Sequence, residues 1–231
     1  MIEVEWWEYD SPEELAEAVA GDVGFIIESA VEARSASLVA LPGGADEAPF
    51  LARLAQQAAP WKKVTIIPTD DLIVAVDDER SQIRSIAKAF LPQGARVFPV
   101  ISGGAEDYRL AGNAADARLQ DLPWPPDLVW LGMGDGGDTA GLFAGPDLHA
   151  ALDAPKARRA IGVMPEGDGA MARVSLTRAA ILSARTILIT VTGQVKRELL
   201  EGAIADGHSS RLPIGRVLAE AEQPIDIHWC P

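Results

Sequence analysis

Residues 127–145, which read DLVWLGMGDGGDTAGLFAG, combine an apolar run with a glycine-rich, acidic turn. The run at 128–131 suits a strand that is buried on both faces. Four of the six residues from 132 to 137 are glycine, so backbone N–H groups there can approach a ligand closely. In open α/β sheets, loops at the carboxyl ends of strands form the ligand crevice. This turn is therefore the predicted centre of the chemistry, and its amides at 134–137 are candidate donors to a developing oxyanion.

The spacing of this turn differs from that of the common nucleotide-binding loops. A P-loop carries a lysine directly after its last glycine, and this turn has none. Gly132, Gly134 and Gly137 match the dinucleotide pattern G-x-G-x-x-G, but three glycines alone are a weak signal. The turn by itself therefore does not predict a nucleotide ligand.

Two further segments are candidates for binding an anion. The pair Gly43-Gly44 follows a short strand predicted at 37–41 and precedes a helix predicted at about 47–58. This order directs free N–H groups and the positive end of a helix dipole toward the loop, although a plain strand-to-helix turn is the alternative. Lys196 lies three residues after Gly193, at the end of a strand predicted at 186–192, and is a candidate phosphate partner.

Strand and helix patterns alternate along the chain. Ser11, Pro12 and Glu14 form a capping box at the start of a helix predicted to reach about residue 33. Further strands are predicted at 63–68, 96–101, 160–164, 172–177 and 225–229, helices at 81–90 and 106–119, and more helical residues at 140–143. The alternation predicts one α/β domain over residues 1–231. Its fold class is a doubly wound, mostly parallel, Rossmann-like sheet with helices on both faces.

Composition and charge narrow the classes of partner. With a net charge of −14, the chain lacks the clustered Lys and Arg of a nucleic-acid surface, so no nucleic acid is expected. One cysteine, Cys230, and three scattered histidines argue against a disulfide and against a metal site. The N-terminus lacks a signal-peptide pattern and no apolar run approaches about 18 residues, so a cytoplasmic protein without a membrane partner is expected. No pattern indicates an oligomeric state.

The stretch 132–145 resembles the signature of 6-phosphogluconolactonases and of the related sugar-phosphate isomerases and deaminases, which reads roughly GMGxDGHTASLFPG. The matching positions are Gly132, Met133, Gly134, Gly137, Thr139, Ala140, Leu142, Phe143 and Gly145. Four positions depart from that signature: Gly136 replaces an aspartate, Asp138 the catalytic histidine, Gly141 a serine and Ala144 a proline.

Other segments resemble the same family, in family order, between about Leu38 and Pro213. They are Gly43-Gly44 for a GGSTP-like loop, Asp70-Asp71-Leu72 for a DER triplet, 173–177 for an RVTLT segment, and Thr192, Gly193 and Lys196 for a TGxxK segment. Ala45 and Asp46 replace the hydroxyl residues of the loop, and Leu72 replaces the arginine of the triplet. The literal triplet Asp78-Glu79-Arg80 reads as a solvated turn, and the sequence leaves open whether Arg80 or Arg84 replaces the lost arginine.

The resemblance implies hydrolysis of 6-phospho-D-glucono-1,5-lactone to 6-phosphogluconate, with a phosphorylated sugar lactone as partner and neither cofactor nor metal. Asp138 then takes the position of the catalytic base, and Asp70 is a second carboxylate that orients water or sugar hydroxyls. Arg173 binds phosphate, with an edge-strand salt bridge as its alternative role. The substrate-binding residues implied are Gly43, Gly44, Gly134, Gly137, Thr139, Arg173 and Lys196.

Two other functions are compatible with the changes at Leu72 and Asp138. The first is a catalytically altered or inactive sugar-phosphate-binding protein, which keeps the anchor but lacks an efficient base, because a carboxylate is a weaker base than histidine. The second is a sugar-phosphate isomerase or deaminase, in which a carboxylate removes a proton next to a carbonyl.

Overall fold

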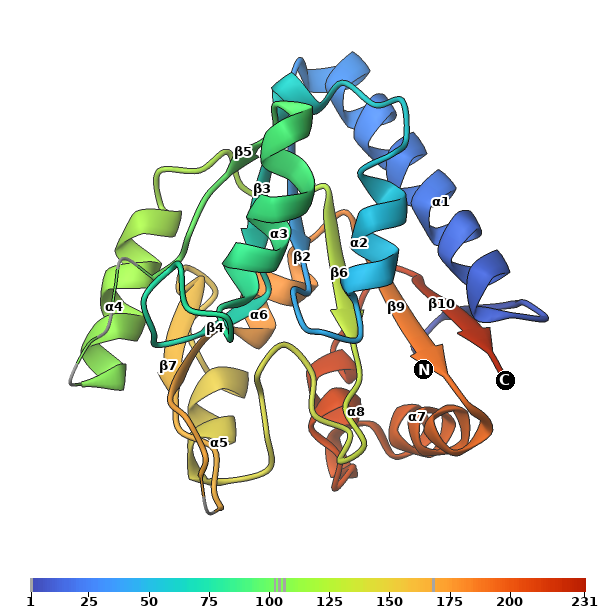
Figure 1. The fold of residues 1–231 in the computed structure, drawn as a ribbon. Coiled ribbons are helices and arrows are strands. Elements are labelled where there is room, and N and C mark those ends of the chain that lie inside the picture. Colours follow the sequence, from blue (N-terminus) through green and yellow to red (C-terminus); the bar gives the residue numbers. More distant parts are fainter. Residues whose placement is uncertain (1, 102, 104, 106, 168) are drawn as a thin grey trace.

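The computed structural model describes residues 2–101, 103, 105, 107–167 and 169–231, and its centre is a seven-stranded parallel sheet (Figure 1). The strands lie in the order β1-β10-β9-β6-β2-β3-β5. Their bounds are β1 (Val4–Glu8), β10 (Ile225–Cys230), β9 (Thr186–Thr192), β6 (Leu128–Gly132), β2 (Ser37–Leu41), β3 (Val64–Pro68) and β5 (Arg96–Val97). The chain leads outward from β2 toward β3 and in the opposite direction from β6 toward β9, so the β2/β6 boundary is a topological switch point.

A second, three-stranded antiparallel sheet lies beside the first. It contains β4 (Asp70–Leu72), β8 (Arg173–Leu176) and β7 (Ala160–Val163), with β8 in the middle. The segments predicted as strands at 160–164 and 172–177 are therefore strands, but neither joins the parallel sheet. They pair with each other, and the second also pairs with β4. The chain reverses between them within a short connection, and a short connection permits only an antiparallel pair.

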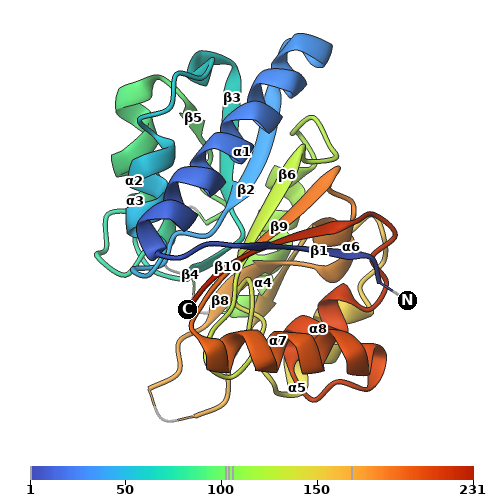
Figure 2. The same cartoon turned by 90° about the vertical axis from the view of Figure 1, so that its right-hand side faces the viewer.

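The central sheet is covered on both faces, as the fold class predicted. In β6, Val129 and Leu131 enter one hydrophobic core, whereas Leu128 and Trp130 enter the other, because side chains alternate along a strand. Three helices pack on the core of Trp130: α1 (Pro12–Arg34), α2 (Ala48–Leu54) and α3 (Gln82–Phe90). Five pack on the other core: α4 (Tyr108–Leu119), α5 (Pro146–Leu152), α6 (Arg178–Leu182), α7 (Gln194–Asp206) and α8 (Pro213–Leu218). Figure 2 shows α1 and α2 on the opposite side of the strands from α7 and α8.

The first long helix begins where its capping residues predicted. The Ser11 side chain accepts a hydrogen bond from the Glu14 amide, and Pro12 occupies the first turn. The helix ends at Arg34, and the next residue, Ser35, caps it with a left-handed φ of 64°. The described residues also form three short 3₁₀ turns: η1 (Trp61–Lys63), η2 (Leu91–Gln93) and η3 (Gly207–Ser209).

Several predicted bounds were wrong for identifiable reasons. The strand predicted at 96–101 contains only Arg96–Val97, since Pro99 has no N–H to donate to a neighbouring strand. The helix predicted at 47–58 ends at Leu54, where the amides of Gln56 and Gln57 bond to carbonyls only three residues back. The helix predicted at 106–119 begins at Tyr108, and Glu106 lies outside the described residues. Strand β1 was not predicted.

The prediction of helical residues at 140–143 was also wrong. Ala140 and Gly141 have φ values of 48° and 68°, and a right-handed helix cannot contain two consecutive residues in the left-handed region. Instead Leu142 donates its N–H to the Thr139 carbonyl over 2.8 Å, which closes a tight turn. Thr139, where this turn begins, is tied to the end of β6 by the hydrogen bond from its Oγ1 to the Gly132 carbonyl.

Candidate functional site

A cavity of about 290 Å³ lies at the carboxyl ends of β2 and β6, at the switch point of the sheet. The predicted site residues that line it are Asp70, Asp138, Gly44, Gly134, Thr139 and Arg173. They come from four separate stretches of the sequence, which only the fold brings together. Open α/β sheets bind ligands at this place, so the cavity is the candidate site.

A larger cavity of about 1020 Å³ adjoins the first, and it is lined by the N-terminal part of α1, by α2 and by the end of β9. Lys196 lines this larger cavity and not the smaller one. Asp46, Glu47 and Met133 line both cavities and stand where they meet. Lys196 and Asp138 thus line different cavities, and the carboxylates of Asp46 and Glu47 belong to both.

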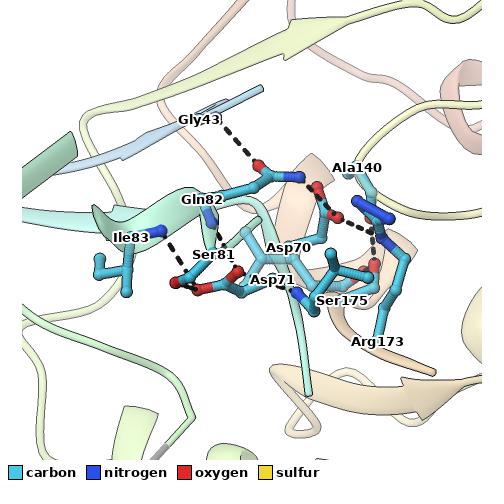
Figure 3. Close-up of polar contacts among 11 residues, drawn as sticks. Gly43, Asp70, Asp71, Ser81, Gln82, Ile83, Ala140, Arg173 and Ser175 are labelled. Carbon is cyan, nitrogen blue, oxygen red and sulfur yellow. Dashed lines mark hydrogen bonds and ion pairs between the residues drawn. The ribbon is translucent and has the colours of Figure 1, made fainter. Parts of the chain in front are cut away.

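Asp70, which lines the smaller cavity, is held in a chain of polar contacts (Figure 3). Its Oδ2 accepts hydrogen bonds from Arg173 Nε over 2.9 Å and from Gln82 Nε2 over 3.0 Å. Gln82 Oε1 in turn accepts the Gly43 N–H over 2.9 Å. Burial raises the pKa of the Asp70 carboxyl above its ordinary range, and Arg173 and Gln82 counter only part of that rise.

Arg173 therefore already has a partner inside the protein. Its side chain is 19% exposed and that of Asp70 only 5%, so this ion pair is buried. The salt bridge, which was the alternative role for Arg173, is present between β8 and β4. A phosphate that binds Arg173 has to share the guanidinium with Asp70.

Asp71 has a different task from Asp70, which sequence reasoning missed. Its carboxylate accepts the N–H groups of Gln82 and Ile83 over 2.7 and 3.2 Å and the Ser81 hydroxyl over 3.0 Å (Figure 3). It thus caps α3, whose own N-cap residue supplies no side-chain bond. Burial raises the pKa of the Asp71 carboxyl, while these hydrogen bonds oppose that rise.

The glycine-rich turn is tightly bonded to itself. Gly134 N–H donates to the Asp138 carbonyl over 2.9 Å, Gly137 N–H donates to the Gly134 carbonyl over 3.0 Å, and Thr139 Oγ1 donates to the Gly132 carbonyl over 2.7 Å. The Asp138 carboxylate folds over Gly134, where any side chain would collide with it. The hydroxyl of Thr139 and the amides of Gly134 and Gly137 thus shape the turn, and the Asp138 side chain faces the cavity.

Lys196 joins α7 to the same turn. Its Nζ donates to the Met133 carbonyl over 3.0 Å and lies 3.2 Å from Asp135 Oδ1. Met133 and Asp135 flank Gly134, so Lys196 contacts the glycine-rich turn, and its role as a phosphate partner stays a prediction. Gly137 does not line either cavity; it has a φ of 70° and packs on Leu212.

Glu47 is the site residue that sequence reasoning did not single out. Its Oε1 and Oε2 each lie 2.5 Å from where a Cβ would stand on Gly132 and on Gly44, so both glycines make room for this carboxylate. Burial raises the pKa of the Glu47 carboxyl, and the nearby Asp46 and Asp70 raise it further, against the opposing effect of Lys196. Its only signal in the sequence was its place just after the Gly43-Gly44 loop.

The two arginines considered as replacements lie outside both cavities. Arg80 pairs with Asp78 over 2.7 Å, and Arg84 lies 3.7 Å from Glu79, with both side chains about half exposed. Asp78, Glu79 and Arg80 thus form the solvated turn that was predicted.

Within the described part of the chain, no group of three or more His, Cys, Asp or Glu is placed to hold a metal ion. The same residues contain no helix that is long and apolar enough to span a bilayer.

Comparison with known proteins gives one consistent result. The family model described as glucosamine-6-phosphate isomerases/6-phosphogluconolactonase matches residues 10–229. A 6-phosphogluconolactonase from Rhizobium meliloti (strain 1021) is 34% identical over 227 residues, which cover 96% of this chain and 97% of that protein. One from Pseudomonas putida is 36% identical, covering 94% and 89% respectively. The crystal structure of a 6-phosphogluconolactonase from Shewanella baltica OS155 has the same fold, with a TM-score of 0.90, 24% identity and coverage of 99% and 98%.

Proposed function

Because this chain belongs to the family of glucosamine-6-phosphate isomerases and 6-phosphogluconolactonases, we propose that it hydrolyses 6-phospho-D-glucono-1,5-lactone to 6-phosphogluconate. This is the lactonase step of the pentose phosphate pathway. The observation that carries the proposal is the match to curated 6-phosphogluconolactonases along 94% or more of the chain. The cavity at the switch point, where Asp138, Asp70 and Arg173 meet, supplies a place for the reaction.

Asp138 is the proposed general base. Hydrolysis requires water to add to the lactone carbonyl carbon, and a base that accepts the water proton assists this step. The ring C–O bond then breaks, and a proton passes to the ring oxygen. Asp138 is the carboxylate of the glycine-rich turn that lines the cavity. The amides of Asp135 and Gly136 are the proposed donors to the oxyanion, because those of Gly134 and Gly137 are bonded within the turn.

Asp70 is proposed to position ligand groups and not to exchange protons. Arg173 and Gln82 hold its Oδ2 in place, which leaves Oδ1 to orient water or a sugar hydroxyl. Lys196, Arg173 and the Gly43-Gly44 loop are the proposed phosphate anchor. We further propose that residues 1–231 act as one lactonase-like domain in the cytoplasm, with a phosphorylated sugar lactone and no nucleic acid as partner.

Purified protein mixed with freshly generated 6-phosphogluconolactone tests this function against a buffer blank. We expect turnover above the spontaneous rate, and a loss of about 10²- to 10⁴-fold in kcat for Asp138→Ala, because that is the usual contribution of a general base. Asp138→His is expected to raise kcat above wild type. Equal rates for wild type, Asp138→Ala and the blank would contradict the proposal.

A sugar-phosphate-binding protein without turnover is the second candidate. The carboxylate at Asp138 and the apolar Leu72 favour it, since both stand where the family signature has a base and a cation. If the protein binds sugar phosphates without turnover, 6-phosphogluconate should raise its melting temperature, although the hydrolysis rate of every variant equals that of the buffer blank. The same samples measured by differential scanning fluorimetry distinguish the two candidates.

A further inference from the structure

The proposed phosphate anchor is already occupied by groups of the protein itself. Arg173 is paired with Asp70, Lys196 donates to Met133 and lies beside Asp135, and the Gly43 N–H is bonded to Gln82. Carboxylates also outnumber cations along the two adjoining cavities, which are lined by the carboxylates of Glu13, Glu14, Glu17, Asp46, Glu47, Asp70 and Asp138 and by the cations of Arg53, Arg173 and Lys196. A doubly negative phosphoryl group therefore meets repulsion here unless a carboxylate moves or is neutralised.

The Glu47 carboxylate is bonded to its own backbone N–H and is not paired with a cation in the described part of the structure. Asp70 is fixed by Arg173 and Gln82, and Asp138 belongs to the self-bonded glycine-rich turn. Glu47 stands at the start of α2, where its side chain makes no capping bond. It also has a longer and more flexible side chain than an aspartate, and it stands in the wall shared by the two cavities. Rotation of this side chain would remove one of the three residues that line both the cavity of Lys196 and the cavity of Asp138.

The Glu47 carboxylate also occupies the space that a bound phosphoryl group would fill. Its two oxygens fill the space left open by Gly44 and Gly132, and it faces the field of Lys196. An anionic ligand that reaches both the Gly44 backbone and Lys196 must displace it. The space is open only because neither glycine has a side chain, and the protein fills that space with its own anion.

We propose that the Glu47 carboxylate is an internal competitor for the phosphoryl group, and that it sets the preference of this enzyme between phosphorylated and unphosphorylated sugar lactones. This inference rests on the proposed function, because it concerns the same site. Glu47 is here a specificity-determining residue without a part in the bond-breaking step.

The test is the kinetics of Glu47→Gln on two substrates, 6-phosphogluconolactone and glucono-1,5-lactone. Removing the charge is expected to lower the KM for the phosphorylated lactone on the order of tenfold, equivalent to about 1.4 kcal/mol. The KM for the unphosphorylated lactone and both kcat values are expected to stay within about twofold, because a group that acts only on ground-state binding leaves kcat unchanged.

Glu13→Gln is the matched control. Glu13 lines the larger cavity from α1, is exposed and loses the same charge, but it does not contact the glycine loops. We expect its kinetics to equal those of wild type. An equal KM decrease in both variants would overturn the proposal, because it would show that the total negative charge of the cavity, and not the position of Glu47, weakens binding. A fall in kcat for Glu47→Gln at unchanged KM would overturn it in favour of a role in the chemistry.

Binding measurements separate this inference from the proposed function. Calorimetry with 6-phosphogluconate and with gluconate reports affinity without turnover. Suppose that no form of the protein hydrolyses either lactone, yet Glu47→Gln binds 6-phosphogluconate on the order of tenfold more tightly than wild type. The proposed lactonase function is then wrong, whereas the inference about Glu47 is supported. If the affinity for 6-phosphogluconate is the same in Glu47→Gln and wild type, the inference falls whatever the turnover.

Discussion

At the scale of residues, the two adjacent aspartates Asp70 and Asp71 show how one short strand serves two purposes. Successive side chains of a strand point to opposite sides, so Asp70 faces Arg173 and the cavity while Asp71 faces the start of α3. Asp71 accepts two amides of that helix and thereby places Gln82, which in turn holds Asp70. Gln82 thus connects the capping residue, Asp71, to the site residue, Asp70.

The Asp70–Arg173 ion pair yields a prediction about stability. Arg173→Met should lower the free energy of unfolding by about 3 kcal/mol, because it leaves the buried Asp70 without its cation. Asp70→Asn should cost less, since the amide can keep a bond to Gln82. The double variant should be more stable than Arg173→Met alone. Urea denaturation of the four proteins at pH 7 measures this, and strictly additive losses would show that the pair is not coupled.

At the scale of elements, α4 and β7 approach so closely that only glycine fits between them. A Cβ on Gly112 would collide with the backbone of Gly162, and one on Gly162 would collide with the Tyr108 carbonyl. This contact joins the small antiparallel sheet to a helix on one face of the central sheet. Because β8 belongs to that small sheet and carries Arg173, the contact also positions the candidate site.

Two glycine-to-alanine variants test the contact. Gly112→Ala should destabilise the protein by about 3 kcal/mol, because neither backbone can move aside easily. Gly21→Ala, in an exposed part of α1 with no atom within 4 Å of the new Cβ, should instead stabilise it by about 0.5–1 kcal/mol. Thermal or chemical denaturation distinguishes these outcomes. Similar small effects at both positions would mean that α4 and β7 are not in tight contact.

At the scale of the whole molecule, a buried histidine ties the sheet edge to the first helix. His228 is 1% exposed; its Nδ1 lies 3.0 Å from the Tyr9 hydroxyl, and its Nε2 lies 3.7 Å from Asp22 Oδ2. Trp7 stacks on its ring. Burial lowers the pKa of His228 from 6.5 to about 4. The folded protein thus holds this imidazole neutral.

The contribution of His228 to the stability of the folded protein should therefore fall in mild acid. His228 binds a proton in the unfolded chain near pH 6.5 but in the folded chain only near pH 4. Protonation of the unfolded chain therefore lowers the free energy of unfolding as the pH falls below 6.5, and this loss is complete near pH 4. Between pH 7 and pH 5 the loss from this residue should be about 2 kcal/mol. Urea denaturation at both values measures it, and His228→Gln should show a pH dependence weaker by that amount. Equal pH dependence in the two proteins would contradict the assignment.

Local patterns in the sequence determined the class of fold and predicted the position of the candidate site. The alternation of apolar runs with amphipathic segments is a local property, and it predicted the parallel sheet with both faces covered. The capping residues Ser11 and Pro12 set the start of α1 for the same reason. The glycine-rich turn after β6 was recognisable because glycine is required where backbone groups crowd.

Only the tertiary structure decided which groups satisfy one another in the site. Arg173 and Asp70 lie 103 residues apart in sequence, and Lys196 reaches a carbonyl 63 residues before it. Glu47 carried no motif, and its importance follows from the space that Gly44 and Gly132 leave for its oxygens. The separate antiparallel sheet was likewise undetermined, because strand pairing depends on contacts between distant segments and not on the local pattern of either strand.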